Sequence, residues 1–505
     1  MSTSSSDTKM EIEPKHGLDY EQHGPVIYGL AVVVSVSVWF LAIRAPLWLD
    51  ETGSYWSISG GFGQIWTRSV DLNSFPAYYY ILWLVHAAFG SKELVLRIPS
   101  VLAMIAAAYV FYCCARELFA WDVAAIATAL FVLDGRIVFA AIDVRPYAFA
   151  LLTTNLAILS FIRWLKTNST SYALLFGVAC GGIFYFHYLF GCIVAAFAVC
   201  YLVNFWHRPV QWKQFGVAAG GFALLIVPVL PRLWYLHQTQ QTHVFSDVPP
   251  FKVFLLELAP GAVPFVFAGV ALVAAFTRKL TVPKRENLRQ LLVCLSLALV
   301  PAGILYGVTL ATPLHIFVER YLGVAIPGLA LTWAWILTLV DSRPLRVLCC
   351  VVFVTWSAYQ SYSSPRASLH GYTWKYALEA ADANAFPDGS PLVVCSDLPE
   401  ADFQKMPAGP ASQSVLFSPL SYYRVRTSVV PMPRALNDQA RAIGRTFFLR
   451  AMLNHQRFVA LAFGPSYPTL QWLANLSSLS YTTHVVGVFD GIAVVEFDPQ
   501  NAGGD

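Results

Sequence analysis

The stretch VIYGLAVVVSVSVWFLAIRAPLWLDE (residues 26–51) decides the fold class of this chain. Arg44 is the only charged residue between Val26 and Leu49, and the segment is long enough to cross a bilayer as a helix. Two adjacent carboxylates, Asp50 and Glu51, follow where the helix would leave the membrane. Ionisable groups are costly to hold near lipid and often have a function there. The alternative interpretation of this acidic pair is the solvated start of a loop.

The remaining sequence has the composition of a multi-pass membrane protein. Of its 505 residues, 57% are hydrophobic and only 12% are charged, and the mean hydropathy is +0.56. An ordinary soluble domain carries roughly 25% charged residues. The net charge of +4 includes no basic tract, which argues against a nucleic-acid partner. Eight of the nine cysteines fall in apolar segments without a CxxC pair, so we interpret them as small apolar side chains.

Apolar segments of roughly 20 residues predict eleven transmembrane helices. They lie near residues 26–48, 98–118, 121–141, 146–165, 171–187, 189–206, 214–232, 253–277, 290–311, 321–341 and 345–363. Residues 1–25 are polar and lack the basic start and short apolar core of a signal peptide. We therefore expect a disordered cytoplasmic tail followed by a transmembrane module over residues 26–364.

The distribution of Lys and Arg predicts the orientation. Basic residues fall in alternate connections between the predicted spans: Arg116; Arg163 and Lys166; Arg208 and Lys213; Arg278, Lys279, Lys284, Arg285 and Arg289; Arg343 and Arg346. Short basic loops stay in the cytoplasm, so these loops and the N-terminus are expected there. Eleven crossings then place the acidic pair and the C-terminal segment outside. We expect a multi-pass protein of a bacterial plasma (inner) membrane.

The first outer loop, residues 49–97, is too long for a simple turn. Its segment from Phe75 to Val85 is apolar, contains clustered Tyr and Trp, and ends shortly before Gly90. About a dozen such residues are too few to span a bilayer and suit a helix lying in the membrane interface.

Residues 365–505 predict a small extracytoplasmic α/β domain. Helices are expected over 375–385 and 434–448, and buried strands over 391–395 and 458–462. A hairpin is expected from 485–489 and 492–497, because Asp490-Gly491 between them is a strong turn signal.

Three outer loops carry residues suited to catalysis at the membrane surface. They are Asp50-Glu51, Asp143 with Arg145 and Tyr147, and Glu319-Arg320-Tyr321 with His315 just before. All lie on the same predicted side, so the loops can converge on one site. A lipid-linked phosphate would suit it, since a carboxylate can accept a proton from an attacking hydroxyl and an arginine can bind phosphate oxygens.

Each feature also has a structural interpretation. Asp143 and Arg145 can pair with each other at a helix end, and Glu319 and Arg320 can form an interfacial charge pair. Glu257 lies within a predicted span and is either a buried polar contact or a site residue. His187 and Tyr188 resemble interface anchors.

The sequence resembles the GT-C glycosyltransferases, and within them the bacterial relatives of protein O-mannosyltransferases and of the aminoarabinose transferase that modifies lipid A. The resemblance rests on short motifs in a matching order and covers most of residues 26–345. The motifs are Leu47-Trp48-Leu49-Asp50-Glu51, Pro76-Ala77-Tyr78-Tyr79, Leu96-Arg97-Ile98-Pro99-Ser100-Val101-Leu102, Arg145-Pro146-Tyr147-Ala148 and Glu319-Arg320-Tyr321-Leu322.

The resemblance implies an inverting transfer of one sugar from a polyprenyl-phosphate donor to a glycan or glycolipid acceptor. It assigns the catalytic base to Asp50, with Glu51 as neighbour or alternate, and places Asp143 in the lining of the site. Arg320 and Tyr321 would lie near the lipid phosphate. The remaining candidates for donor or substrate binding are Tyr78, Arg97, Arg145, Tyr147 and His315.

The chain also departs from the family pattern. It has Phe75-Pro76-Ala77-Tyr78 where the family often has Pro-Pro-Leu-Tyr, and its C-terminal domain lacks the signature of the extra lumenal domain of protein mannosyltransferases. The second difference argues against a protein acceptor, although a protein O-mannosyltransferase remains the alternative. A transporter or flippase for lipid-linked saccharides is a third hypothesis, but charges gathered on one face favour an enzyme. The use of a divalent metal stays open.

Overall fold

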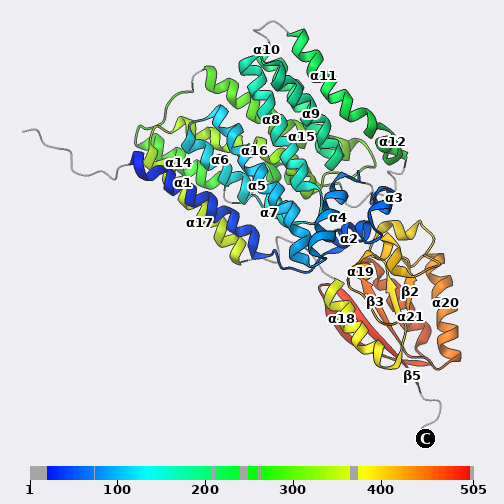
Figure 1. Cartoon of the computed structure of the whole chain (residues 1–505). Helices are drawn as coiled ribbons and strands as arrows, with labels where there is room; N and C mark the ends of the chain where they lie inside the picture. The colour runs from blue at the N-terminus through cyan, green and yellow to red at the C-terminus, as the bar shows by residue number, and fades with distance from the viewer. Residues whose placement is uncertain are drawn as a thin grey trace, which may run out of the picture.

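The computed structural model describes residues 20–500 except 73, 206–210, 239–247, 260, 262, 284 and 364–373. Figure 1 shows a large bundle of helices joined at one end to a smaller domain that contains strands. Residues 1–19 of the expected tail lie outside the described part, and Tyr20 already belongs to helix α1.

The bundle consists of helices that overlap the eleven predicted spans. They are α1 (Tyr20–Ser37), α5 (Glu93–Leu118), α6 (Trp121–Leu133), α7 (Gly135–Ile142), α8 (Tyr147–Thr167), α9 (Thr170–Phe186), α10 (Ile193–Phe205), α11 (Trp212–Ile226), α12 (Leu230–Gln238), α13 (Phe251–Leu258), α14 (Val263–Phe276), α15 (Arg285–Ala311), α16 (Ile326–Ile336) and α17 (Arg343–Ser363). Among the described residues, five helices are long and apolar enough to cross a membrane, or up to seven if the bent pairs α6–α7 and α13–α14 each count as one. The number eleven therefore stays a prediction.

The core of the bundle depends on small residues at helix contacts. Gly177 of α9 lies against the backbone of Ala218 in α11, and Gly328 of α16 lies against the backbone of Leu297 in α15. A Cβ atom at either glycine would collide with that backbone. Small residues allow this close approach of helices, which is a common way of packing apolar helices in a membrane.

The first outer loop folds into three helices. They are α2 (Leu49–Ser59), α3 (Ile65–Asp71) and α4 (Ala77–Phe89). The predicted short helix near residues 75–85 is present as α4, whose 13 residues would extend only about 20 Å at 1.5 Å per residue. That length is below the roughly 30 Å thickness of a bilayer core.

The C-terminal domain contains one five-stranded sheet with the strand order β2-β1-β3-β5-β4. Its elements are α18 (Trp374–Ala385), β1 (Leu392–Cys395), α19 (Ser418–Tyr422), β2 (Val429–Met432), α20 (Asp438–Leu453), β3 (Phe458–Phe463), α21 (Tyr467–Ser477), β4 (Tyr481–Phe489) and β5 (Ile492–Pro499). Strand β1 is parallel to both β2 and β3, whereas β5 is antiparallel to β3 and β4.

Most of the predicted elements of this domain are present. The predicted hairpin is β4–β5, and Asp490 and Gly491 both have positive φ, as a two-residue turn between strands requires. Helix α20 begins later than predicted because the side chain of Asn437 accepts the Ala440 N–H and caps it there. Strand β2 and helix α21 were missed by the sequence pattern.

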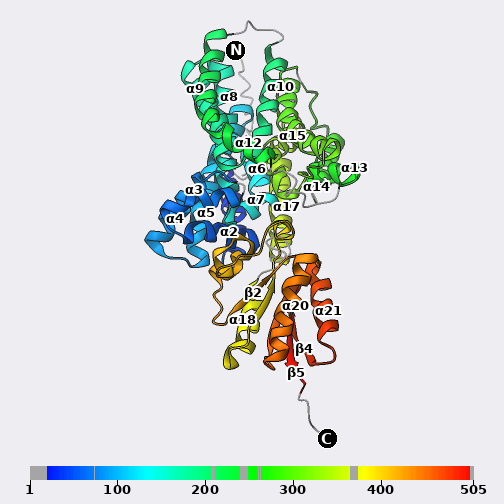
Figure 2. The ribbon, with the colours of Figure 1, turned by 90° about the vertical axis from the view of Figure 1, so that its right-hand side faces the viewer.

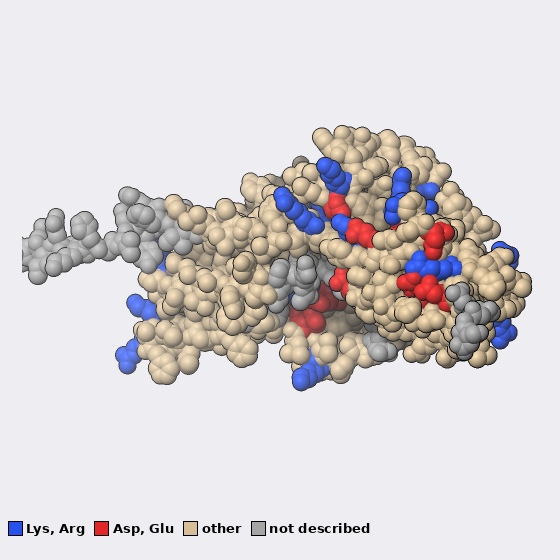
Figure 3. All heavy atoms as spheres, turned by 90° about the horizontal axis from the view of Figure 1, so that it is seen from below, with Lys and Arg blue, Asp and Glu red and all other residues tan. Residues whose placement is uncertain are grey.

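The two parts of the molecule meet at helix α2. The Thr52 and Ser418 hydroxyls lie 3.1 Å apart, and the Trp56 indole N–H donates to the Gln413 carbonyl at 3.0 Å. Figure 2 shows the C-terminal domain at the end of the bundle where α2 lies. Seen from that end, charged side chains gather over the domain, while much of the bundle surface is uncharged (Figure 3).

Candidate active site

Helix α2 presents the acidic pair on its first turn. The helix begins at Leu49, after Trp48 in an extended conformation, and the Trp48 N–H donates to Glu51 Oε2 at 3.2 Å. Carboxylates are favoured at a helix N-terminus because they face its positive dipole end. Consecutive residues of a helix point about 100° apart, so the two carboxylates enter different surroundings.

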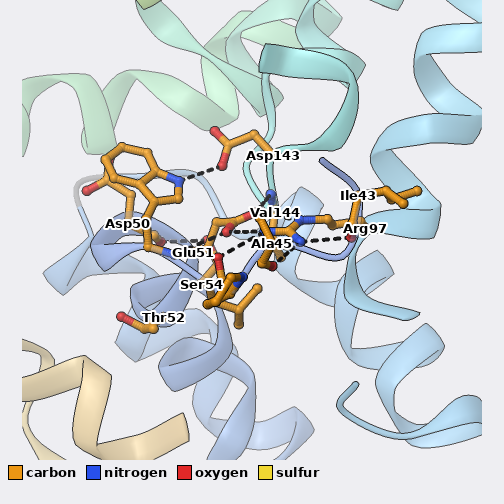
Figure 4. Close-up of polar contacts among 12 residues, drawn as sticks. Ile43, Ala45, Asp50, Glu51, Thr52, Ser54, Arg97, Asp143 and Val144 are labelled. Carbon is orange, nitrogen blue, oxygen red and sulfur yellow. Dashed lines mark hydrogen bonds and ion pairs between the residues drawn. The ribbon is translucent and has the colours of Figure 1, made fainter. Parts of the chain in front are cut away.

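Glu51 is fully buried and holds three segments together. Its carboxylate forms a two-pronged ion pair with Arg97, with Nη2–Oε2 at 2.7 Å and Nε–Oε1 at 3.1 Å (Figure 4). Glu51 Oε1 also accepts the Val144 N–H at 3.0 Å. Arg97 has no exposed surface either, and it donates to the carbonyls of Ile43 and Ala45. This ion pair therefore links α2 to α5 and to the segment before α8.

Asp50 points instead toward solvent-accessible space. Its Oδ2 lies 2.9 Å from Arg320 Nη1, and the two side chains are 20% and 24% exposed. The Arg320 guanidinium also lies 5.7 Å from the Trp48 ring and 5.3 Å from the Tyr321 ring. A proton acceptor and a cation that are 270 residues apart in sequence are thus in direct contact. The suggested Glu319–Arg320 charge pair is not formed.

Asp143 lies behind Trp48, whose indole N–H donates to its Oδ1 at 3.0 Å. The Asp143 side chain is fully buried, and its Oδ2 has no hydrogen-bond partner among the described residues. Burial, followed by the negative charge of Glu51, raises the pKa of Asp143 well above its usual value. Asp143 forms no ion pair with Arg145 within the described part of the chain.

A cavity of about 320 Å³ lies between the helical bundle and the C-terminal domain. Predicted site residues that line it are Asp50, Arg145, His315, Arg320 and Tyr321. The Nε of Arg145 is buried, and its guanidinium makes no hydrogen bond or ion pair among the described residues. The predicted residues in the cavity wall therefore combine one carboxylate, Asp50, with two arginines, Arg145 and Arg320, and arginine can bind phosphate oxygens.

His187 belongs to this cavity, although its sequence context suggested an interface anchor. It lies between α9 and the short helix η3 (Tyr188–Cys192), with its ring 5.0 Å from Tyr147 and 5.3 Å from Tyr321. His187 therefore lines the cavity and packs against two tyrosine rings.

Other predicted residues lie outside the cavity wall. Tyr78 is fully buried, with its ring centroid 5.5 Å from Tyr79, and Tyr147 is buried behind His187. Glu257 forms an ion pair with Arg136 at 3.1 Å, which fits its structural interpretation. Across the described residues, no three His, Cys, Asp or Glu side chains are placed to hold a metal ion.

Sequence reasoning missed the part of the cavity wall that the C-terminal domain provides. Asp397, Glu400, Arg434 and Phe463 all line the cavity. The available signal was that Asp397 and Phe463 come at the ends of predicted buried strands, where ligand sites of α/β domains occur. Arg434 had no such signal because β2 was not predicted.

Part of the sequence matches the model of a known protein family. Residues 73–235 match the sequence model of the dolichyl-phosphate-mannose-protein mannosyltransferase family. No curated protein matches the chain in sequence.

Several solved structures resemble the whole chain. The arabinofuranosyltransferase AftD from Mycobacteria has 12% identity and a TM-score of 0.53, with 97% of this chain and 41% of AftD covered. ArnT from Cupriavidus metallidurans, bound to undecaprenyl phosphate, has 12% identity and a TM-score of 0.46, with 96% and 100% covered. The Archaeoglobus fulgidus oligosaccharyltransferase, tethered to an acceptor peptide, has 13% identity and a TM-score of 0.49, with 96% and 74% covered. The chain therefore has the GT-C fold of membrane glycosyltransferases, and its residues 73–235 carry the sequence pattern of the dolichyl-phosphate-mannose-protein mannosyltransferases.

Proposed function

We propose that this protein is a membrane glycosyltransferase that moves one sugar, with inversion, from a polyprenyl-phosphate donor to a glycan or glycolipid at the outer face. The observation that carries the proposal is the contact between Asp50 and Arg320 at the cavity surface, 2.9 Å apart. It places a group that can accept a proton beside a group that can bind a phosphate.

In the proposed reaction, an acceptor hydroxyl attacks the anomeric carbon of the donor sugar. Asp50 takes the proton of that hydroxyl, and the bond between the sugar and the lipid phosphate breaks on the opposite side of the carbon. The leaving polyprenyl phosphate keeps the electron pair, and Arg320 and Arg145 stabilise its negative charge. When the phosphate binds Arg320, it also separates Arg320 from Asp50 and leaves the carboxylate available to the acceptor.

The other carboxylates have supporting roles in this proposal. Glu51 cannot leave its buried ion pair with Arg97 without exposing an unpaired charge to the core, so we assign it the positioning of α2. Asp143 orients the Trp48 indole, which in turn lies against Arg320.

The match of residues 73–235 supports a polyprenyl-phosphate donor, because the name of the matched family specifies dolichyl-phosphate mannose. The same match keeps protein O-mannosyltransferase as the second candidate. A saccharide transporter is less well supported, because the charged candidates lie at one end of the bundle next to the C-terminal domain.

The decisive experiment combines donor binding with sugar transfer in purified full-length protein. Asp50→Asn should abolish transfer from polyprenyl-phosphate sugars and leave binding of undecaprenyl phosphate intact, because the amide cannot take up the proton. Arg320→Ala should mainly weaken undecaprenyl phosphate binding. Asp341→Asn, an exposed carboxylate away from the cavity, is the matched control. Full transfer activity in the Asp50 variant would rule out its assignment as base.

A further inference from the structure

The carboxyl ends of three parallel strands face the cavity. Strands β2, β1 and β3 run in the same direction side by side, so their carboxyl ends form one edge of the sheet. Arg434 follows β2, Asp397 follows β1 and Phe463 ends β3, and all three line the cavity. Ligands of α/β sheets bind in the crevice outside this edge. The topology thus marks the domain's wall of the cavity as a binding surface.

The backbone at this edge is held in place. The Ser396 N–H donates to the Met432 carbonyl at 3.0 Å, which extends the pairing of β1 with β2 beyond the strands. Asp402, at the end of the short helix η9 (Pro399–Asp402), accepts the Ala435 N–H at 2.6 Å. Arg434 therefore lies between two anchored residues, Met432 and Ala435. A backbone fixed in this way limits the entropy that a bound ligand would have to remove.

The Arg434 guanidinium has no partner in the described protein. Its Nε is buried, and it makes no hydrogen bond or ion pair with any described residue. A buried donor without a partner is costly. Arg320, by comparison, already contacts Asp50. The C-terminal domain thus offers an unused hydrogen-bond donor to whatever enters the cavity.

The chemistry of this wall suits a neutral saccharide. Arg434 can only donate hydrogen bonds, while the nearby carboxylates Asp397 and Glu400 accept them. Sugar hydroxyls both donate and accept, so they can satisfy such a mixed set. Two carboxylates would repel a phosphate or another anion. The ring of Phe463 adds an apolar surface for the C–H face of a sugar.

We propose that the carboxyl edge of β2-β1-β3 is the acceptor subsite and binds a neutral oligosaccharide. This assignment rests on the proposed function. It gives the two walls of the cavity to different substrates. The bundle wall with Arg145 and Arg320 binds the donor phosphate, whereas the wall with Arg434 binds the acceptor. An acceptor sugar held there presents a hydroxyl to Asp50 across the cavity.

The test uses full-length protein in detergent and a panel of neutral methyl glycosides, di- and trisaccharides. Saturation-transfer NMR should show binding of at least one panel member by the wild type. Arg434→Ala should weaken that binding by about tenfold, the loss expected for a hydrogen bond to a charged group. Arg445→Ala, an exposed arginine on α20, is the matched control and should bind as the wild type does.

Binding of undecaprenyl phosphate, measured on the same samples, separates this inference from the proposed function. Arg434→Ala should leave it unchanged. No saccharide binding, or equal binding by Arg434→Ala and the wild type, overturns the acceptor subsite even if undecaprenyl phosphate binds. If a serine- and threonine-rich peptide binds instead of a saccharide, and its binding is lost in Arg434→Ala, the saccharide assignment is overturned. Failure to bind undecaprenyl phosphate counts against the proposed function alone.

Discussion

Two neighbouring carboxylates of one helix turn have different surroundings. Glu51 has no exposed surface and shares both oxygens with Arg97, whereas Asp50 is 20% exposed and contacts Arg320 at the cavity. Because both residues are acidic and adjacent, composition and spacing could not separate them. Their difference comes from the rotation between consecutive helical residues, which sends one side chain inward and the other outward.

The buried Glu51–Arg97 pair should contribute more to the stability of the protein than the partly exposed contact between Asp50 and Arg320. Glu51→Ala leaves the buried charge of Arg97 without its carboxylate partner, and we expect a loss of about 3–5 kcal/mol in the free energy of unfolding. Thermal unfolding in detergent measures it, and Glu51→Ala combined with Arg97→Met should recover part of the loss. Asp50→Asn, whose partner can reach solvent, should cost about 1 kcal/mol or less. Equal losses for Glu51→Ala and Asp50→Asn would contradict the assigned roles.

Asp143 predicts a pH dependence of stability. The pKa of Asp143 in the folded protein is raised above its value in the unfolded chain. Its contribution to the free energy of unfolding is therefore fully present below the unfolded pKa and is lost as the pH rises through the folded pKa. Asp143→Asn resembles the protonated form and cannot titrate. The melting temperature of Asp143→Asn should therefore rise relative to that of the wild type as the pH is raised from 5 to 8. A difference that stays constant over this range would show that Asp143 does not titrate with a raised pKa.

At the scale of the element, α2 is held from the side of the C-terminal domain. The Leu47 N–H donates to the Tyr423 hydroxyl oxygen at 2.6 Å, and that hydroxyl donates back to the Leu47 carbonyl at 3.2 Å. Tyr422 donates to the Ser91 carbonyl at 2.8 Å. Burial raises the pKa of Tyr423, so its hydroxyl keeps the proton that it donates. The domain thus fixes the residues that lead into the acidic pair.

Tyr423→Phe removes only this hydroxyl. We expect kcat for sugar transfer to fall by about five- to tenfold, as for the loss of one or two hydrogen bonds, with unchanged binding of undecaprenyl phosphate. Tyr467→Phe is the matched control, because its hydroxyl also donates to a backbone carbonyl, that of Gly491, but within the domain. If both variants have the same kcat, the Tyr423 contact does not position α2.

The elements themselves were predictable to different degrees. Short apolar runs indicate strands β1 and β3, and the pair Asp490-Gly491 indicates the turn of the β4–β5 hairpin. Strand β2 was missed because it has four residues, contains Pro431, and lies at the edge of the sheet, where proline is tolerated. Missing β2 also hid Arg434, since its position follows from the end of that strand.

At the scale of the whole molecule, the cavity belongs to neither part alone. Its lining includes Asp50 and Arg320 from the bundle and Asp397 and Arg434 from the domain. The proposed reaction requires both walls of the cavity to lie on one side of the membrane, and the predicted topology places the basic connections on the other side.

Labelling of single cysteines tests this orientation. Lys405→Cys lies on an exposed part of the C-terminal domain, and Lys279→Cys lies on an exposed basic connection between α14 and α15. In intact cells, a membrane-impermeant maleimide should label position 405, and it should label position 279 only after permeabilisation. The wild-type chain measures the background from its own cysteines. Labelling of position 279 in intact cells would reverse the proposed topology.

The sequence by itself determined the membrane class, the approximate positions of the bundle helices, the C-terminal α/β domain and the loops that carry charge. These follow from apolar length and periodicity, which neighbouring residues establish among themselves. Only the tertiary structure decided that Asp50 contacts Arg320 while Glu51 is buried with Arg97, and that Arg434 shares the cavity. Such contacts depend on how each helix is rotated and on which segments pack together. No local pattern encodes them.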